Sequence, residues 1–256
     1  MTRDAIFRLA LEQSARDSNC RPEDFLRAEN VIVESAANGD ARRYLELPFA
    51  CDLTSYGENI VASVAPQLRE TVTEYVNRFP AHACFETPNL HVLMDALRPH
   101  GLNACFMAEY WLPDPNALCA LECPYETRIL QCADFQALYR PEWSNALCEK
   151  RRELDVLAVG AYDNGRLIGL AGCSADCRTM WQIGVDVLPG YRRQGVASAL
   201  TSRLALEILA REKAPFYCCA WSNVRSARNA IRSGFRPAWV QLTARPEAQI
   251  AELNEK

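Results

Sequence analysis

Apolar residues in the second half of the chain recur at the two spacings that distinguish strands from helices. Two runs of apolar and β-branched residues, 156–162 and 166–173, flank the tripeptide Asp163-Asn164-Gly165 and predict a hairpin with a tight turn. Further on, apolar residues recur at every fourth position and predict a helix over 196–211 with one buried face. The members of that face are Val196, Leu200, Leu204 and Ile208.

The elements around these alternate in a regular order. We expect two short helices at 133–138 and 143–153, a strand at 181–187, a strand at 216–221, and a last helix that starts after Asn223. The full order is helix–helix–strand–strand–strand–helix–strand–helix–strand. This order predicts an α/β (α+β) domain with a mixed sheet flanked by helices.

The first half of the chain shows a similar but shorter succession. It predicts a strand at 59–64, a helix at 68–76, a strand at 83–86, a helix at 89–97 and a strand at 103–111. One interpretation is that this half is a smaller, degenerate copy of the second domain that has lost the loop corresponding to the one between the strand at 181–187 and the helix at 196–211. The alternative is a plain α+β domain whose element order matches by coincidence.

The domain boundary is predicted from the segment that follows these strands. Leu112-Pro113-Asp114-Pro115-Asn116 contains two prolines and helix-breaking polar residues, which is typical of a linker. We therefore expect an N-terminal α/β domain over 1–112, a linker over 113–125 and a second domain over 126–256.

Composition narrows the class of protein. The 256 residues carry a net charge of −4, and no cluster of basic residues predicts binding to nucleic acid. No apolar run is long enough to span a bilayer, and the N-terminus forms an amphipathic helix pattern instead of a signal peptide. We expect a soluble, cytoplasmic protein with no membrane partner.

Twelve cysteines are scattered along the chain, most of them within apolar runs, which favours buried, reduced thiols. Two pairs with three residues between them, Cys119/Cys123 and Cys173/Cys177, have a spacing that zinc tolerates. No histidine lies near either pair, so no metal is expected. The histidines are His82, His91 and His100.

The segment between the predicted strand at 181–187 and the predicted helix at 196–211 carries the most specific chemistry. Its sequence is Tyr191-Arg192-Arg193-Gln194-Gly195-Val196-Ala197-Ser198. A basic loop with a glycine at a helix N-terminus presents unpaired N–H groups at the positive end of the helix dipole. Gly195 and Ala197 allow close approach to the backbone, so the loop is suited to bind a diphosphate.

This loop resembles the Q/R-x-x-G-x-G/A signature of the GNAT acyl-CoA N-acetyltransferases, with Arg192, Gly195 and Ala197 at the defining positions. A second match lies downstream in the correct order: a strand at 216–221, then Asn223, Ser226 on a helix, and Gly234-Phe235. The resemblance covers roughly residues 126–245. It implies a GNAT-like mixed sheet and acetyl-CoA as co-substrate, and the first half then becomes a candidate for a degenerate GNAT-like domain.

The resemblance also implies roles for residues of the loop and its neighbours. The strand before the loop splays from the next strand and pairs with the pantetheine arm through the main chain of Val185, Asp186 and Val187. The loop holds the diphosphate, and two further residues contact the cofactor from the last helix. The loop residues are Arg193, Gln194, Gly195, Val196, Ala197 and Ser198, and the further residues are Asn223 and Ser226.

The catalytic acid and base are where the sequence departs from the family. Many members carry a tyrosine at the position of Ala230 as proton donor to the thiolate, and members with a carboxylate base place it near Trp181 or Cys218. Three explanations stay open: proton removal by water with catalysis by positioning, a carboxylate from elsewhere, or binding without transfer. The candidate carboxylates are Glu142, Glu149 and Asp176.

Two functions follow from this. The first is an N-acetyltransferase that moves an acetyl group from acetyl-CoA to a primary amine of a small molecule. The second is a non-catalytic acyl-CoA-binding module that acts as a sensor or scaffold.

Four aromatic residues near the expected opening of the site are candidates for a flat apolar wall: Trp143, Trp181, Tyr217 and Trp221. Trp221 is the better candidate for a pocket wall, and Trp181 is expected in the core.

Overall fold

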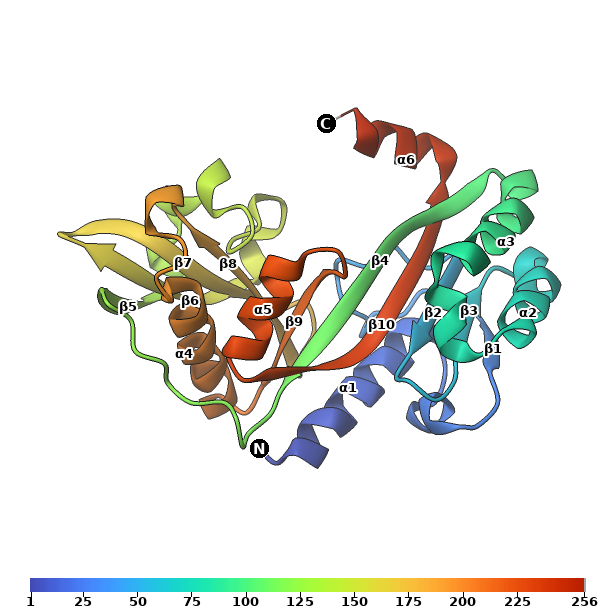
Figure 1. Ribbon diagram of the computed structural model, residues 1–256, viewed down its shortest axis with the longest axis horizontal. Coiled ribbons are helices and arrows are strands. Elements are labelled where there is room, and N and C mark those ends of the chain that lie inside the picture. Colours follow the sequence, from blue (N-terminus) through green and yellow to red (C-terminus); the bar gives the residue numbers. More distant parts are fainter. Residues whose placement is uncertain (256) are drawn as a thin grey trace. The chain divides into compact units, whose positions relative to one another are not determined.

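The computed structural model describes residues 1–255 and divides into two compact units (Figure 1). One unit contains residues 1–9 and 111–237, and the other contains residues 10–110 and the chain from 238 on. The predicted domains were 1–112 and 126–256. The division differs from them because residues 1–9 belong to the unit of residues 111–237, and residues from 238 on belong to the unit of residues 10–110. The reason at the C-terminal end is a pairing between distant segments: β10 (Phe235–Pro246) pairs with β2 (Cys51–Ser55), in the register Val240↔Ser55 to Ala244↔Cys51.

The unit of residues 10–110 contains a four-strand succession β1–β3–β2–β10. The strands β1 (Val31–Glu34) and β3 (Val61–Val64) are parallel, and β2 is antiparallel to β3 and to β10. The helices α2 (Arg69–Arg78) and α3 (Thr87–Leu97) follow β3, and β4 (Leu102–Pro113) comes next. The helix α1 (Arg3–Ser18) begins in the other unit and continues into this one, and α6 (Glu247–Asn254) is the last helix of the described residues.

The strand predicted at 83–86 is wrong. Residues Ala81–Phe85 form a 3-10 helix, and the carbonyls of this segment are used by side chains: Tyr75 Oη donates to Cys84 O at 2.7 Å, and Asn89 Nδ2 donates to Ala83 O at 2.8 Å. The parallel partner of β3 is β1, which comes from upstream in the chain. A degenerate copy of the second domain would need that strand between α2 and α3, so this part of the proposed repeat is absent.

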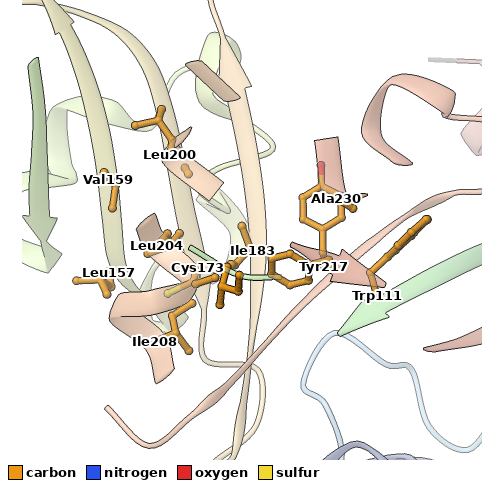
Figure 2. Packing of buried hydrophobic residues seen from close by; sticks show 14 of the residues in the cluster. Trp111, Leu157, Val159, Cys173, Ile183, Leu200, Leu204, Ile208, Tyr217 and Ala230 are labelled. Atoms are coloured by element: carbon orange, nitrogen blue, oxygen red, sulfur yellow. The ribbon is translucent and has the colours of Figure 1, made fainter. Parts of the chain in front are cut away.

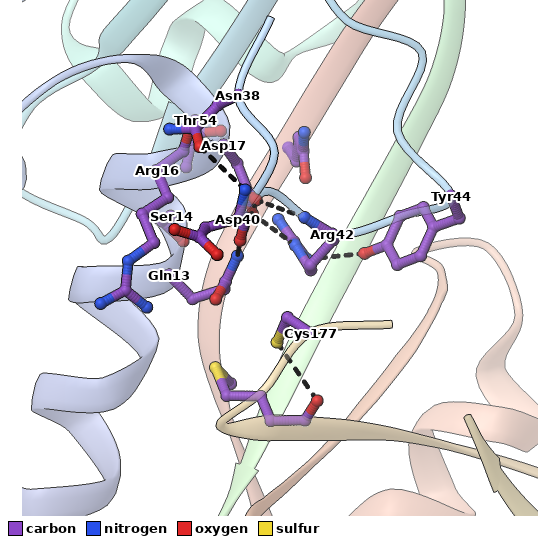
Figure 3. Close-up of polar contacts among 12 residues, drawn as sticks. Gln13, Ser14, Arg16, Asp17, Asn38, Asp40, Arg42, Tyr44, Thr54 and Cys177 are labelled. Atoms are coloured by element: carbon purple, nitrogen blue, oxygen red, sulfur yellow. Dashed lines mark hydrogen bonds and ion pairs between the residues drawn. The ribbon is translucent and has the colours of Figure 1, made fainter. Parts of the chain in front are cut away.

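A buried polar cluster lies in the same unit (Figure 3). The Arg42 guanidinium is paired with Asp17 through Nε and Oδ2 at 2.5 Å, and both side chains are buried. Arg42 Nη1 also donates to Tyr44 Oη at 2.6 Å. The pair joins α1 to the segment before β2, and removal of either partner would leave an uncompensated buried charge.

Asp52 on β2 is a second buried charge in this unit. Its Oδ1 accepts hydrogen bonds from Gln241 Nε2 at 2.9 Å and Thr243 Oγ1 at 2.6 Å, and its Oδ2 accepts one from Thr54 Oγ1 at 3.1 Å. Burial raises the pKa of Asp52 to about 6, and these hydrogen bonds oppose the rise.

The unit of residues 111–237 contains the succession β9–β8–β7–β6–β5. The strands β5 (Glu126–Gln131), β6 (Asp155–Asp163), β7 (Arg166–Ser174) and β8 (Met180–Val187) are antiparallel neighbours, and β9 (Ala214–Ala220) runs parallel to β8. The predicted hairpin at 163–165 is confirmed, with Asn164 at φ 48° and Gly165 at φ 81°. Two successive left-handed residues are what a type I′ turn requires.

The two short helices predicted before the hairpin take a different form. The segment from Cys132 to Leu154 contains four 3-10 helices, Cys132–Asp134, Gln136–Leu138, Pro141–Trp143 and Glu149–Leu154, and no α-helix. Proline at the start of one of them and a non-helical residue, Arg151, inside another break the α-helical hydrogen-bond series.

The apolar face of the long helix is confirmed (Figure 2). The helix α4 (Val196–Ala210) contacts β6, β7 and β8. Its buried residues at every fourth position join a cluster with apolar residues of those strands. The α4 residues are Val196, Leu200, Leu204 and Ile208, and the strand residues include Leu157, Val159, Cys173 and Ile183.

The cysteines are less buried than their apolar surroundings predict. All twelve are free; five are buried, among them Cys173 and Cys177, whereas Cys119 is exposed. Within residues 1–255 no three His, Cys, Asp or Glu side chains come together in a group able to hold a metal ion. None of the helices described there has the length and apolar character needed to cross a membrane.

Candidate functional site

The parallel strands β8 and β9 separate partway along their length. Their pairing runs from Met180↔Ala214 to Ile183↔Tyr217 and stops there, although β8 continues to Val187 and β9 to Ala220. On its other side β8 stays paired with β7 as far as Val187. The edge of β8 over residues 184–187 therefore presents main-chain groups without a strand partner, and the resemblance had implied this opening.

The loop after β8 ends at the N-terminus of α4 and contains two residues in the left-handed region. Arg193 has φ 64° and Gly195 has φ 84°. Gly195 is the N-cap of α4 and no side chain caps the helix there. Because the first intrahelical bond runs from Ala199 N to Gly195 O, the N–H groups of Val196, Ala197 and Ser198 have no partner within the helix. Such a succession of N–H groups forms a concave site for an anion.

Side chains around the loop hold it in this shape. Arg192 Nε donates to Val187 O at 2.9 Å, which ties the loop to the end of β8. Gln194 Nε2 donates to Gly190 O at 3.2 Å, and Gln194 Oε1 accepts from Tyr125 Oη at 2.7 Å. The loop is therefore organised before any ligand binds, which reduces the entropy lost on binding.

The helix α5 (Val224–Arg232) forms the opposite wall. Its N-cap is Asn223, whose Oδ1 accepts from Ser226 N at 3.2 Å. Two hydrogen bonds connect α5 and the turn after it to α4: Asn229 Nδ2 donates to Thr201 Oγ1 at 3.1 Å, and Ser233 Oγ donates to Ser198 O at 3.3 Å. The wall and the loop are thereby fixed to each other.

Between these elements lies a cavity of about 820 Å³. Ten of the eleven residues predicted to bind the cofactor line it. The exception is Gln194, whose side chain is engaged with Tyr125 and Gly190 instead. The ten are Val185, Asp186, Val187, Arg193, Gly195, Val196, Ala197, Ser198, Asn223 and Ser226.

The cavity also contains residues that the sequence interpretation did not assign. Three arginines of α5, Arg225, Arg228 and Arg232, line it together with Arg192 of the loop. Their spacing of three and four residues was visible in the sequence, because such residues share one face of a helix. That this face turns toward the cavity required the structure.

A second cavity of about 350 Å³ fills the opening between β8 and β9. It shares Val185, Tyr217, Asn223 and Ser226 with the first cavity, so the two are adjacent. Its lining has no acidic or basic side chain among the described residues. The remaining members of the lining are Asn145, Gln182, Ile183, Gly184, Cys218, Cys219 and Ala220.

The wall of this second cavity at Asn145 is held by β8. Asp186 accepts hydrogen bonds from Asn145 N at 2.8 Å, Asn145 Nδ2 at 2.6 Å and Ala146 N at 3.0 Å. Two glycines of the sheet make room for the segment: a Cβ on Gly184 would lie 1.8 Å from Asn145 O, and one on Gly172 would lie 2.1 Å from Ala146 O. The carboxylate of Asp186 thus positions residues 145 and 146, and Asp186 also lines the larger cavity.

Tyr217 lies where the two cavities meet and where the strand pairing ends. The Tyr217 hydroxyl shares a hydrogen bond of 2.7 Å with Ser226 Oγ, and burial raises the pKa of this phenol. Ser226 and Ala230 are one turn apart on α5, so the hydroxyl faces the side of the helix that carries Ala230 (Figure 2). Ala230 is buried and lines neither cavity, whereas Tyr217 lines both and provides a phenol there.

The other candidate side chains lie away from both cavities. Glu142 and Glu149 are exposed, and Asp176 is buried and paired with Arg151. Trp221 is 53% exposed and lines neither cavity, so the preference for it as a pocket wall was wrong. Trp181 packs against the core as expected.

The loop before α4 and the separated strands β8 and β9 lie within the part of the chain that matches a known protein family. Residues 121–235 match the acetyltransferase (GNAT) family. This part of the chain is a GNAT-family domain. A search of curated proteins found no match.

Several solved structures are similar at low sequence identity. A GCN5-related N-acetyltransferase-like protein from Streptococcus suis is 19% identical, with 62% of this chain and 69% of that one covered and a TM-score of 0.44. A GCN5-related N-acetyltransferase from Kribbella flavida is 19% identical, with 59% and 63% covered and a TM-score of 0.46. A GCN5-related N-acetyltransferase from Sphaerobacter thermophilus is 14% identical, with 73% and 72% covered and a TM-score of 0.46.

Proposed function

We propose that the protein is an N-acetyltransferase that moves the acetyl group of acetyl-CoA to a primary amine of a small molecule. The observation that carries this is the adjacency of two cavities along one unpaired strand edge. The larger cavity has an amide cradle at Val196–Ser198 for a diphosphate, and the smaller one begins where β8 and β9 separate.

The residues of the larger cavity fit acetyl-CoA. The N–H groups of residues 196–198 would hold the diphosphate, and the free edge of β8 over 185–187 would pair with the amides of the pantetheine arm as a strand does. Acetyl-CoA supplies a thioester carbonyl that an amine attacks and a sulfur that leaves as a thiolate. An unpaired N–H of β8 is the donor available to a developing oxyanion.

Tyr217 is the group we assign to proton donation. As the amine nitrogen forms its bond to the carbonyl carbon and the carbon–sulfur bond breaks, the sulfur needs a proton, and the Tyr217 hydroxyl is positioned at the junction of the cavities to give one. Ser226 Oγ, at 2.7 Å, stabilises the phenolate that remains. Water takes the proton released by the amine, because no carboxylate among residues 1–255 lines the smaller cavity.

The size and lining of the smaller cavity indicate the size and polarity of the amine acceptor. Its volume of about 350 Å³ and its amide, hydroxyl and thiol groups suit a small, polar molecule that binds without a strong ionic contact. The amine enters neutral, as the attack requires, since no carboxylate there stabilises the ammonium form.

A non-catalytic acyl-CoA-binding module is the second candidate, and the absence of a carboxylate from the described lining of the smaller cavity favours it. One experiment separates the two. The protein is incubated with acetyl-CoA and a panel of small polar amines while free thiol is followed, and acetyl-CoA binding is measured by calorimetry. Thiol release that depends on an amine supports the transferase, whereas binding without release across the panel supports the module. Absence of binding contradicts both.

A further inference from the structure

Two carboxamide side chains line the smaller cavity from one face of the sheet. Gln182, Gly184 and Asp186 alternate along β8 and therefore share a face. The segment at Asn145 crosses the same face, because a Cβ on Gly184 would lie 1.8 Å from Asn145 O and the carboxylate of Asp186 binds Asn145 directly. Asn145 and Gln182 are therefore neighbours in the lining of this cavity.

The contacts of these carboxamides decide which of their atoms remain available to a ligand. A carboxylate only accepts hydrogen bonds, so Asn145 turns its Nδ2 toward Asp186 and donates to Oδ1 at 2.6 Å. Gln182 Nε2 donates to Cys218 Sγ at 3.0 Å. Within residues 1–255, no group donates to Oδ1 of Asn145 or to Oε1 of Gln182. This wall of the cavity consequently offers hydrogen-bond acceptors.

A wall with two amide oxygens matches a neutral primary amine. Such an amine has two N–H donors and one lone pair. With one N–H on each oxygen, the lone pair stays free to attack the thioester carbonyl carbon. After the attack one proton of the nitrogen passes to water, the thiolate leaves, and the amide that is formed keeps one N–H. A secondary amine has a single N–H and leaves one of the two oxygens without a donor.

We infer that Oδ1 of Asn145 and Oε1 of Gln182 bind the amino group of the acceptor and select primary over secondary amines, and that Asp186 is the positioning residue that fixes the orientation of Asn145. The inference rests on the proposed function, since it assumes that the smaller cavity holds the amine. Selection follows because an acceptor that loses its hydrogen bond to water and gains no donor opposes binding.

The test compares matched amines. Small polar primary amines, ethanolamine among them, and their N-methyl derivatives are offered with acetyl-CoA to the parent and to the Asn145→Leu and Gln182→Leu variants, and thiol release is followed. The quantity compared is the ratio of kcat/KM for a primary amine to kcat/KM for its N-methyl derivative, because the intrinsic reactivities of the two amines cancel between proteins.

The ratio should be about tenfold higher for the parent than for either variant, because the single N–H of the N-methyl amine satisfies the one oxygen that remains. Ser144→Ala is the control and should keep the ratio of the parent. Ser144 is exposed and adjacent to Asn145, and it lines neither cavity.

Asp186→Asn tests the positioning role. An asparagine at 186 donates as well as accepts, so Asn145 can turn its carboxamide and present Nδ2 to the amine. The ratio should therefore fall in Asp186→Asn, and the double variant with Asn145→Leu should have the ratio of Asn145→Leu alone. A merely structural role of Asp186 would lower kcat/KM for both amines and leave their ratio unchanged.

The remaining outcomes overturn the inference in different ways. Equal ratios in the parent and the Leu variants overturn it while the transferase stands. A lower acetyl-CoA affinity in the Leu variants, measured by calorimetry and with an unchanged ratio, assigns these residues to the cofactor site instead. Binding of acetyl-CoA without thiol release for any amine overturns the inference together with the transferase. If thermal unfolding shows that one Leu variant is not folded, the other decides.

Discussion

Gly195 offers a direct test of the amide cradle, because its substitution acts on the loop in two separable ways. The residue has φ 84°, and a Cβ there meets no atom within 4 Å. An alanine is therefore accommodated in space but is strained in the left-handed region, at a cost of about 1–2 kcal/mol in stability. The Gly195→Glu side chain adds a negative charge beside the N–H groups of residues 196–198. This charge would repel the diphosphate of the ligand. At about 4 Å, two like charges repel by about 1 kcal/mol in water and by more in a partly closed site.

We expect Gly195→Glu to weaken coenzyme A binding by tenfold or more, which is about 1.4 kcal/mol. Gly195→Ala should lower the melting temperature with a smaller effect on affinity. Gly190→Glu is the matched control, since Gly190 lies in the same loop, has open space around a Cβ and lines neither cavity. Calorimetry gives the affinities and thermal unfolding gives the stability. Parent-like affinity of Gly195→Glu would refute the cradle as the binding site.

Three further substitutions test other parts of the structure. Tyr217→Phe should lower kcat for an amine found in the panel by about a hundredfold while leaving acetyl-CoA affinity unchanged; an unchanged kcat would remove Tyr217 from proton donation. Asp52 has a pKa of about 6 in the folded protein against 3.8 ordinarily, so its stabilising effect is complete below about pH 4 and is lost as pH rises through 6. Asp52→Asn should therefore exceed the parent in stability by up to about 3 kcal/mol at pH 8 and match it near pH 4, as measured by urea denaturation; a constant difference across pH would contradict this. Gly184→Ala should cost about 2 kcal/mol of unfolding free energy, because its Cβ would overlap Asn145 O, whereas Gly190→Ala should unfold near the parent midpoint.

Local signals predicted most helices and strands of the GNAT-family domain, but not β5 or the 3-10 form of the segment 132–154. The hairpin at 163–165 was found because two left-handed residues in sequence favour asparagine and glycine. The helix α4 was found from its four-residue period, and Asn223 was found as a helix start. Eight of the ten predicted residues that line one cavity are close together because the end of β8, the loop after it and the first turn of α4 carry them.

What escaped prediction depends on contacts between distant segments. The pairing of β10 with β2 joins residues nearly two hundred positions apart, and no local pattern indicates it. The segment 81–85 has strand-like composition, but hydrogen bonds from Tyr75 and Asn89 occupy its carbonyls. In the site, Tyr217 was considered only as part of an apolar wall, because its hydrogen bond to Ser226 depends on how α5 docks.

The late position of β10 in the chain has a consequence for biosynthesis. The edge of β2 lacks its partner until residues 240–244 have left the ribosome, after every other strand has been made. Throughout that interval the nascent protein exposes unsatisfied backbone donors and acceptors next to apolar side chains, a surface prone to intermolecular association. Chaperone dependence during synthesis should accordingly exceed what the mature protein needs after denaturation and dilution, when all segments are present from the start.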